Sequence, residues 1–79
     1  MKVSYCVCST NEQETTILIL LASNSKFWKD NEVDLKFSKG ESETSVEQFM
    51  EIIGEYNNVK HIAEDLFGET DFDKYMKKL

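Results

Sequence analysis

Residues 32–56, which read EVDLKFSKGESETSVEQFMEIIGEY, contain the change of hydrophobic period that decides the expected fold. In residues 32–37 apolar and charged side chains alternate, a pattern typical of a strand with one wet face. After Gly40 the apolar residues recur at helical spacing, and residues 44–47, T-S-V-E, fit the capping box that begins many helices. We therefore expect a strand in the first part and an amphipathic helix over residues 46–56, capped by Thr44. The apolar stripe of this helix consists of Val46, Phe49, Met50, Ile53 and Tyr56.

Two further strands are expected before this stretch. Residues 2–8 alternate between polar side chains and β-branched or aromatic ones, which predicts a strand with one apolar face. Residues 15–22 form a nearly continuous run of β-forming residues and leucines. Such a run suits a central strand buried on both faces, or a strand whose outer face is partly covered. A turn is expected at residues 23–26.

Two further helices are expected after it. Residues 59–67 carry apolar side chains at i, i+3, i+4, i+7 and i+8, with Asn58 as the N-cap and Gly68 in the C-cap position. Residues 72–79 repeat apolar side chains at helical spacing and predict a third, short helix. The expected fold class is therefore α+β: a three-stranded antiparallel sheet followed by two amphipathic helices and a short C-terminal helix, in the order β-β-β-α-α-α. Residues 1–79 are expected to form a single small domain.

The charge is strongly acidic and unevenly distributed along the chain. There are 15 acidic residues and 9 basic ones, which gives a net charge of −6, and every basic residue is lysine. Direct binding of nucleic acid is not expected, because it requires a basic surface. Residues 41–73 contain ten acidic residues and one lysine, Lys60, whereas the first forty residues are neutral overall.

Within this acidic half, four glutamates recur every four residues. On a helix they would form a row of carboxylates about 6 Å apart along the axis. Like charges at this spacing cost about 0.2–0.5 kcal/mol per pair, and no lysine is placed to compensate them. The row is therefore a candidate partner-binding surface, and a solvated acidic face is the simpler alternative. Its members are Glu43, Glu47, Glu51 and Glu55.

Two other groups of residues are candidates for partner binding. The first is a second acidic cluster after residue 63, which consists of Glu64, Asp65, Glu69, Asp71 and Asp73. The second is the aromatic pair Phe27 and Trp28, which follows an expected turn and is flanked by lysines. The pair could be a contact surface, or one or both rings could belong to the core; the sequence leaves this open.

The sequence offers little for catalysis, and we expect no enzyme activity. It contains one histidine, His61, and no arginine, phosphate-binding glycine loop or nucleophile motif. Cys6 and Cys8 are expected on one face of a strand as reduced, half-buried thiols. A closed zinc site would need more cysteine or histidine ligands, so neither a metal nor a cofactor is expected.

The compartment is inferred from the absence of two signals. The first residues have no apolar core of the kind found in secretory signals, and the longest apolar run, residues 17–22, is far shorter than the roughly 20 residues of a membrane span. A cytoplasmic protein without membrane contact is expected.

The passage over residues 37–49, FSKGESETSVEQF, carries a resemblance to a known class of proteins. It looks like the transition from the last strand, through a loop rich in Ser and Glu, into an amphipathic helix in small phage-encoded anti-CRISPR proteins. Those proteins have a three-stranded antiparallel sheet followed by acidic helices, and they block a CRISPR effector by mimicking DNA. The resemblance covers approximately residues 2–67 and consists of topology and charge.

These observations lead to one expected function and one alternative. The expected function is that of a small acidic phage or mobile-element inhibitor that mimics nucleic acid and binds the basic nucleic-acid-binding surface of a host defence protein, such as a CRISPR effector. The alternative is a protein-interaction module that is not a mimic: an antitoxin, a host-takeover factor or a structural homodimer. Both a monomer and a homodimer are compatible with the sequence.

Overall fold

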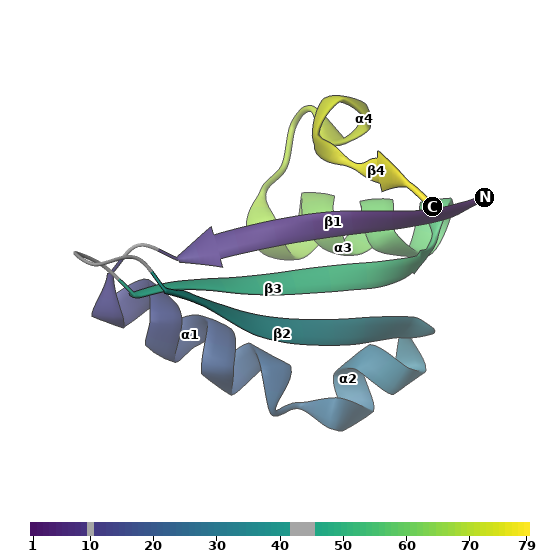
Figure 1. The fold of residues 1–79 in the computed structure, drawn as a ribbon. Coiled ribbons are helices and arrows are strands. Elements are labelled where there is room, and N and C mark those ends of the chain that lie inside the picture. Colours follow the sequence, from purple (N-terminus) through teal and green to yellow (C-terminus); the bar gives the residue numbers. More distant parts are fainter. Residues whose placement is uncertain (10, 42–45) are drawn as a thin grey trace.

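The computed structural model describes residues 1–9, 11–41 and 46–79, which form one four-stranded antiparallel sheet with helices on one of its faces (Figure 1). The strands are β1 (Lys2–Ser9), β2 (Val33–Glu41), β3 (Val46–Glu55) and β4 (Lys77–Lys78). Their order across the sheet is β2-β3-β1-β4. The fold is therefore α+β as expected, but the described part of the chain contains a fourth strand that the sequence analysis did not predict.

Four helices connect these strands. They are α1 (Glu12–Ala22), α2 (Ser25–Asp30), α3 (Tyr56–Phe67) and α4 (Phe72–Tyr75). Two helices lie between β1 and β2, and two lie between β3 and β4. Because β1 and β2 both pair antiparallel with β3, they run parallel to each other with β3 between them. This is the split β-α-β arrangement, and the order β-β-β-α-α-α is wrong.

Residues 15–22 form most of helix α1 and not the expected strand. The side chain of Asn11 accepts a hydrogen bond from the backbone N–H of Glu14 at 2.9 Å and caps the start of the helix. Glu12 and Glu14 lie in the first turn, where their negative charges interact favourably with the positive end of the helix dipole and stabilise the helix. The connection from β1 to the parallel strand β2 also has to cross the sheet, and a helix is the usual way to do so.

Residues 46–55 form the central strand β3 and not the expected helix. Tyr5 of β1 and Leu35 of β2 both pair with Ile52 in register. Met50 and Ile52, two residues apart, are fully buried under the helices. At Gly54 a Cβ atom would lie 3.1 Å from Cγ1 of Val33, so the absence of a side chain lets the neighbouring strand approach. Thr44, the expected N-cap, lies outside the described residues.

The last helix is shorter than expected. Residues 72–79 were expected to be helical throughout, but α4 ends at Tyr75 and the following Lys77–Lys78 pair with Val3 and Ser4 of β1. The backbone N–H of Leu79 donates to the carbonyl of Lys2 at 3.0 Å, which extends this pairing. The C-terminal residues of the chain therefore cover the edge of β1.

The remaining elements agree with the sequence only in part, because helix α2 was not predicted. The helix expected over residues 59–67 lies within α3, and Gly68 ends it in the left-handed conformation with φ of +67°. α3 begins earlier than expected, at Tyr56, so Asn58 is not its N-cap. The turn expected at residues 23–26 is brief, because α2 already begins at Ser25.

The core lies between the sheet and the helices. The indole of Trp28 is 4% exposed, and its Nε1–H donates to the carbonyl of Leu21 at 2.7 Å. Its ring is therefore a core residue with its polar atom satisfied. Among the residues whose side chains the structure describes, the buried core cluster draws on β1, β2, β3 and the helices α1 to α4. Its members are Val3, Tyr5, Leu18, Trp28, Val33, Met50, Ile52, Val59, Ile62, Ala63 and Phe72.

Candidate acidic binding surface and adjoining pocket

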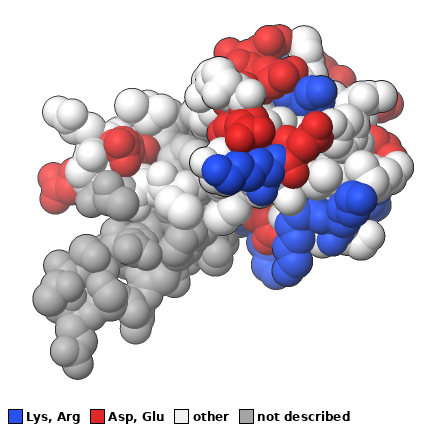
Figure 2. All heavy atoms as spheres, turned by 90° about the horizontal axis from the view of Figure 1, so that it is seen from above, with Lys and Arg blue, Asp and Glu red and all other residues white. Residues whose placement is uncertain are grey.

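Five acidic residues follow one another between the last turn of α3 and α4, and we call them the acidic surface: Glu64, Asp65, Glu69, Asp71 and Asp73. Glu69 is half-buried and the other four are exposed. Seen from above the fold, acidic side chains gather at one edge of the molecule with lysine side chains among them, and further lysines lie toward the opposite edge (Figure 2). The second cluster predicted from the sequence is thus presented to solvent.

The backbone of the acidic surface is anchored by one aromatic side chain. Phe72, in α4, is 3% exposed and packs against Tyr5 and Tyr56, with ring centroids 5.7 and 5.5 Å apart. Gly68 redirects the chain after α3, so that α4 returns over the edge of the sheet. The short segment that carries the last three acidic residues is therefore fixed to the core and does not depend on its own helical stability.

Two tyrosine hydroxyls hold carboxylates of this surface. Oη of Tyr5 donates to Oε2 of Glu69 at 2.6 Å, and the backbone N–H of Asp71 donates to Oε1 of the same carboxylate at 3.0 Å. These hydrogen bonds, that of Tyr5 first, lower the pKa of Glu69. The hydroxyl of Tyr56 likewise donates to the carboxylate of Asp73, and this bond raises the pKa of Tyr56. Glu69 is therefore held in its charged form.

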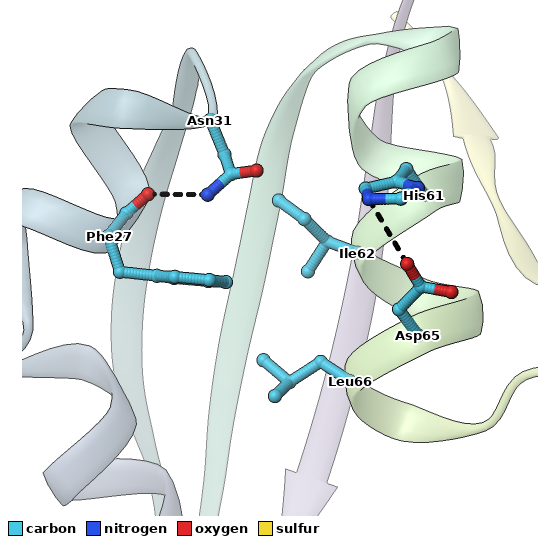
Figure 3. A pocket seen from close by; sticks show the side chains of 6 residues that line it. All are labelled: Phe27, Asn31, His61, Ile62, Asp65 and Leu66. Atoms are coloured by element: carbon cyan, nitrogen blue, oxygen red, sulfur yellow. Dashed lines mark hydrogen bonds and ion pairs between the residues drawn. The ribbon is translucent and has the colours of Figure 1, made fainter.

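A pocket of about 190 Å³ lies between α2 and α3, next to the acidic surface (Figure 3). Three apolar side chains point into it: the ring of Phe27 from α2, and Ile62 and Leu66 from α3. Its polar lining residues are Asn31, His61 and Asp65. Leu66 is 39% exposed although its position in the apolar stripe of α3 predicts burial.

The polar residues of the pocket are held by neighbours on their own helices. Nε2 of His61 lies 3.1 Å from Oδ2 of Asp65, one helical turn further along α3. Nδ2 of Asn31 donates to the carbonyl of Phe27 at 2.8 Å. Among the described lining residues there is no serine, cysteine or lysine that His61 could activate as a nucleophile, so the pocket is arranged for binding an apolar group beside a charge.

The structure brings some of the predicted site residues together and separates others. Phe27 and Asp65, which lie 38 positions apart in the sequence, line the same pocket. Trp28, the neighbour of Phe27, points into the core and is not available to a partner. Four lining residues were not predicted as site residues, because only the packing of α2 against α3 places them there: Asn31, His61, Ile62 and Leu66.

The predicted row of glutamates does not exist as a helical row. Glu51 and Glu55 lie on strand β3, where residues four positions apart are separated by about 13 Å instead of about 6 Å. Glu51 accepts a hydrogen bond from Oγ of Ser4 at 2.7 Å. Glu55 lies 2.9 Å from the N-terminal ammonium, which lowers the pKa of its carboxyl. Glu43 and the side chain of Glu47 lie outside the described residues.

Cys6 and Cys8 share the face of β1 that the helices leave uncovered. Both are free thiols, and both are exposed, not half-buried as expected. Partial desolvation, followed by the neighbouring Cys8 and Glu51, raises the pKa of Cys6 to about 11. At neutral pH this thiol is therefore protonated, which makes it a poor nucleophile. Within residues 1–9, 11–41 and 46–79 no group of three potential metal-binding side chains is found.

No protein-family model matches this sequence, and no curated protein or solved structure matches it either. In the described part of the chain, every helix is too short or too polar to cross a membrane. The acidic surface and the adjoining pocket are therefore the features of the molecule that indicate a function.

Proposed function

We propose that this chain is a small inhibitory protein that binds the basic, nucleic-acid-binding surface of another protein. The observation that carries the proposal is the acidic surface beside the pocket between α2 and α3, with Asp65 belonging to both. The carboxylates would meet lysine and arginine side chains of the partner, and the pocket would receive an apolar side chain beside them.

The distribution of charge supports a basic partner. Glu64 to Asp73 is a stretch of ten positions that contains five carboxylates and no lysine. Such a concentration of one sign creates a local field that attracts a basic surface and accelerates association. A basic groove built for nucleic acid can neutralise only one polyanion at a time, so occupation by this protein would exclude nucleic acid.

The pocket supports a protein as the partner. An apolar space of side-chain size, lined by Phe27, Ile62 and Leu66, suits an aliphatic or aromatic anchor residue. Nucleic acid itself would be repelled by the acidic surface. The proposal therefore joins an electrostatic contact, which governs the association rate, to an apolar anchor, which governs the lifetime of the complex.

A CRISPR effector is one partner of this description, and a phage or another mobile element is the corresponding source. Residues 46–55 form strand β3, whereas the resemblance to anti-CRISPR proteins depended on a helix in this segment. This proposal consequently rests on the acidic surface and not on that resemblance. The alternative is an interaction module that uses the same surface against a partner that does not bind nucleic acid.

The proposal is tested with two variants of equal charge. In the first, Glu64→Gln, Asp65→Asn and Asp71→Asn neutralise three of the five residues of the acidic surface. In the second, Asp30→Asn, Glu32→Gln and Asp34→Asn neutralise three exposed acids elsewhere. Each changes the net charge from −6 to −3, because three carboxylates are removed. Both variants and the wild type are immobilised, and proteins retained from a bacterial lysate are identified by mass spectrometry.

We expect a nucleic-acid-binding protein to be retained by the wild type and by the second variant, and lost with the first. Fluorescent nucleic acid is then titrated into the purified complex, and it should displace this protein. Retention of the same proteins by all three baits would contradict a role for the acidic surface. A ternary complex formed without loss of affinity would exclude mimicry and favour the alternative interaction module.

A further inference from the structure

Helix α1 has apolar side chains on nearly all of its sides, although the sheet covers only one of them. Leu18 is 4% exposed and faces the core, with Leu21 and Ala22 packed beside it. On the outer side Ile17 is 55% exposed and Leu20 is 66% exposed. Helices that are apolar all round are normally buried on all sides, so the outer side of α1 indicates a contact surface.

The outer side of α1 is a different part of the molecule from the acidic surface, although Ile17 lines a pocket together with Phe67 at the end of α3. In Figure 1, α1 and α2 lie toward the β2 edge of the sheet, and α4 lies toward the opposite edge, beside β4. The exposed apolar residues Ile17 and Leu20 are three positions apart, so they stand close together on the helix surface. Ile19, which is 49% exposed, flanks them.

The charges at the two ends of this surface have opposite signs. Glu12 lies in the first turn of α1, and it is exposed. Lys26 and Lys29 lie in α2, directly after the end of α1, and both are exposed. A helix that is acidic at its beginning and is followed by lysines is complementary to a second copy of itself that runs in the opposite direction.

We propose that two copies of this chain associate through the outer side of α1, with the two α1 helices antiparallel across a two-fold axis. In this arrangement Ile17 of each copy packs against Leu20 of the other copy. Glu12 of each copy then lies at the end where Lys26 of the other copy is found. The contact is isologous, so every residue pair occurs twice, as in most homodimers.

A second copy fits this surface better than a membrane does. α1 has 11 residues, and a helix of that length is about 16 Å long, which matches an equal helix laid along it. The acidic residues at its beginning, Glu12 and Glu14, and the net charge of −6 oppose adsorption to anionic lipid.

The dimer is tested by sedimentation equilibrium over a range of protein concentrations. We expect wild-type protein to dimerise, and Ile17→Gln with Leu20→Gln to raise the dissociation constant at least tenfold. Tyr75→Gln with Leu79→Gln is the matched control, because these residues are also exposed, at 59% and 64%, but lie outside α1. Circular dichroism establishes that each variant is folded. A monomeric wild type, or a dimer that the α1 variant leaves intact, would overturn the proposal.

A charge exchange tests the antiparallel arrangement separately. Glu12→Lys alone and Lys26→Glu alone should each weaken the dimer several-fold, because each places like charges together. The double variant Glu12→Lys with Lys26→Glu should restore the wild-type dissociation constant. Restoration supports a second copy in the proposed orientation. Additive weakening overturns that orientation, and wild-type monomers that cosediment with vesicles of anionic lipid would assign the surface to a membrane.

Discussion

Tyr5 connects the core of the protein to its acidic surface. Its ring lies in the core cluster, 5.7 Å from the ring centroid of Phe72, while its hydroxyl donates to Glu69 at 2.6 Å. Burial of the ring, and then the hydrogen bond to Glu69, raise the pKa of Tyr5. The hydroxyl is therefore protonated at neutral pH and donates to Glu69. One side chain thus contributes both packing and the position of a charged group.

We expect the Tyr5→Phe variant to lower the free energy of unfolding at neutral pH and to lose less stability on acidification than the wild type. The folded-state pKa of Glu69 lies below its ordinary value of 4.5, so its contribution is present above that value. It is lost as the pH falls through the lower, folded-state pKa. Without the tyrosine hydroxyl this contribution is smaller, and the two proteins should converge in stability at the lowest pH.

The measurement is urea unfolding between pH 7 and pH 2. Tyr75→Phe is the control, because it removes the hydroxyl of an exposed tyrosine, and its stability should follow the wild type throughout. A difference between Tyr5→Phe and the wild type that stays constant over the whole range would mean that Glu69 is not involved.

At the scale of elements, α2 depends on a single anchor. It has only six residues, and helices of that length are not stable in isolation. Trp28 holds it to the core through its buried ring and through the hydrogen bond to the carbonyl of Leu21 at 2.7 Å. Phe27, its neighbour, packs edge-on against it with ring centroids 4.9 Å apart and forms one wall of the pocket. Two adjacent aromatic residues therefore have different roles.

We expect Trp28→Ala to lower the free energy of unfolding by about 3–5 kcal/mol, the scale of a truncated core aromatic residue. Phe27→Ala should cost about 1 kcal/mol, since its ring is only half-buried, but should weaken binding of the partner that the pocket receives. Thermal and urea unfolding measure the first effect, and titration of the partner measures the second. Equal losses of stability in both variants would show that Phe27 belongs to the core as fully as Trp28.

At the scale of the whole molecule, β3 holds the sheet together. It pairs with β1 over residues 48–55 and with β2 over residues 46–54, so it is hydrogen-bonded along both edges. Its inward residues Met50 and Ile52 are fully buried. β4, with two residues, pairs only at the edge of β1. The molecule can therefore open at β4 without separating the central strands.

Native-state hydrogen exchange should detect this difference directly. We expect the amides of residues 50–54 to exchange only through global unfolding, and those of Lys77–Lys78 to exchange through local opening at a free energy several kcal/mol lower. Residue-resolved exchange by nuclear magnetic resonance in increasing urea separates the two classes. If residues 50–54 exchanged as readily as those of α4, or showed the sequential contacts of a helix, the position of β3 in the sheet would be wrong.

Local patterns in the sequence determined several parts of this protein. The alternation of residues 2–8 and 32–37 predicted β1 and the start of β2, and apolar spacing with Gly68 predicted most of α3. The acidic cluster from Glu64 to Asp73 was predicted as well, because net charge and exposure follow directly from residue type. These predictions depend on interactions within a few positions of each residue, which is why they could be made without the fold.

The secondary structure of residues 15–22 and 46–55 was decided only by the tertiary structure. The first segment was predicted as a strand and is a helix, and the second was predicted as a helix and is a strand. A continuous apolar run has no period, so it fits a buried strand and a helix equally well. Glutamates four positions apart share one side of a helix and also one face of a strand, since four is close to 3.6 and is a multiple of two. The crossover between the parallel strands β1 and β2, and the pairing of β3 with both, settled these cases. The pocket that Phe27 and Asp65 line could not be predicted from local patterns either, because its walls come from α2 and α3, which are far apart in the sequence.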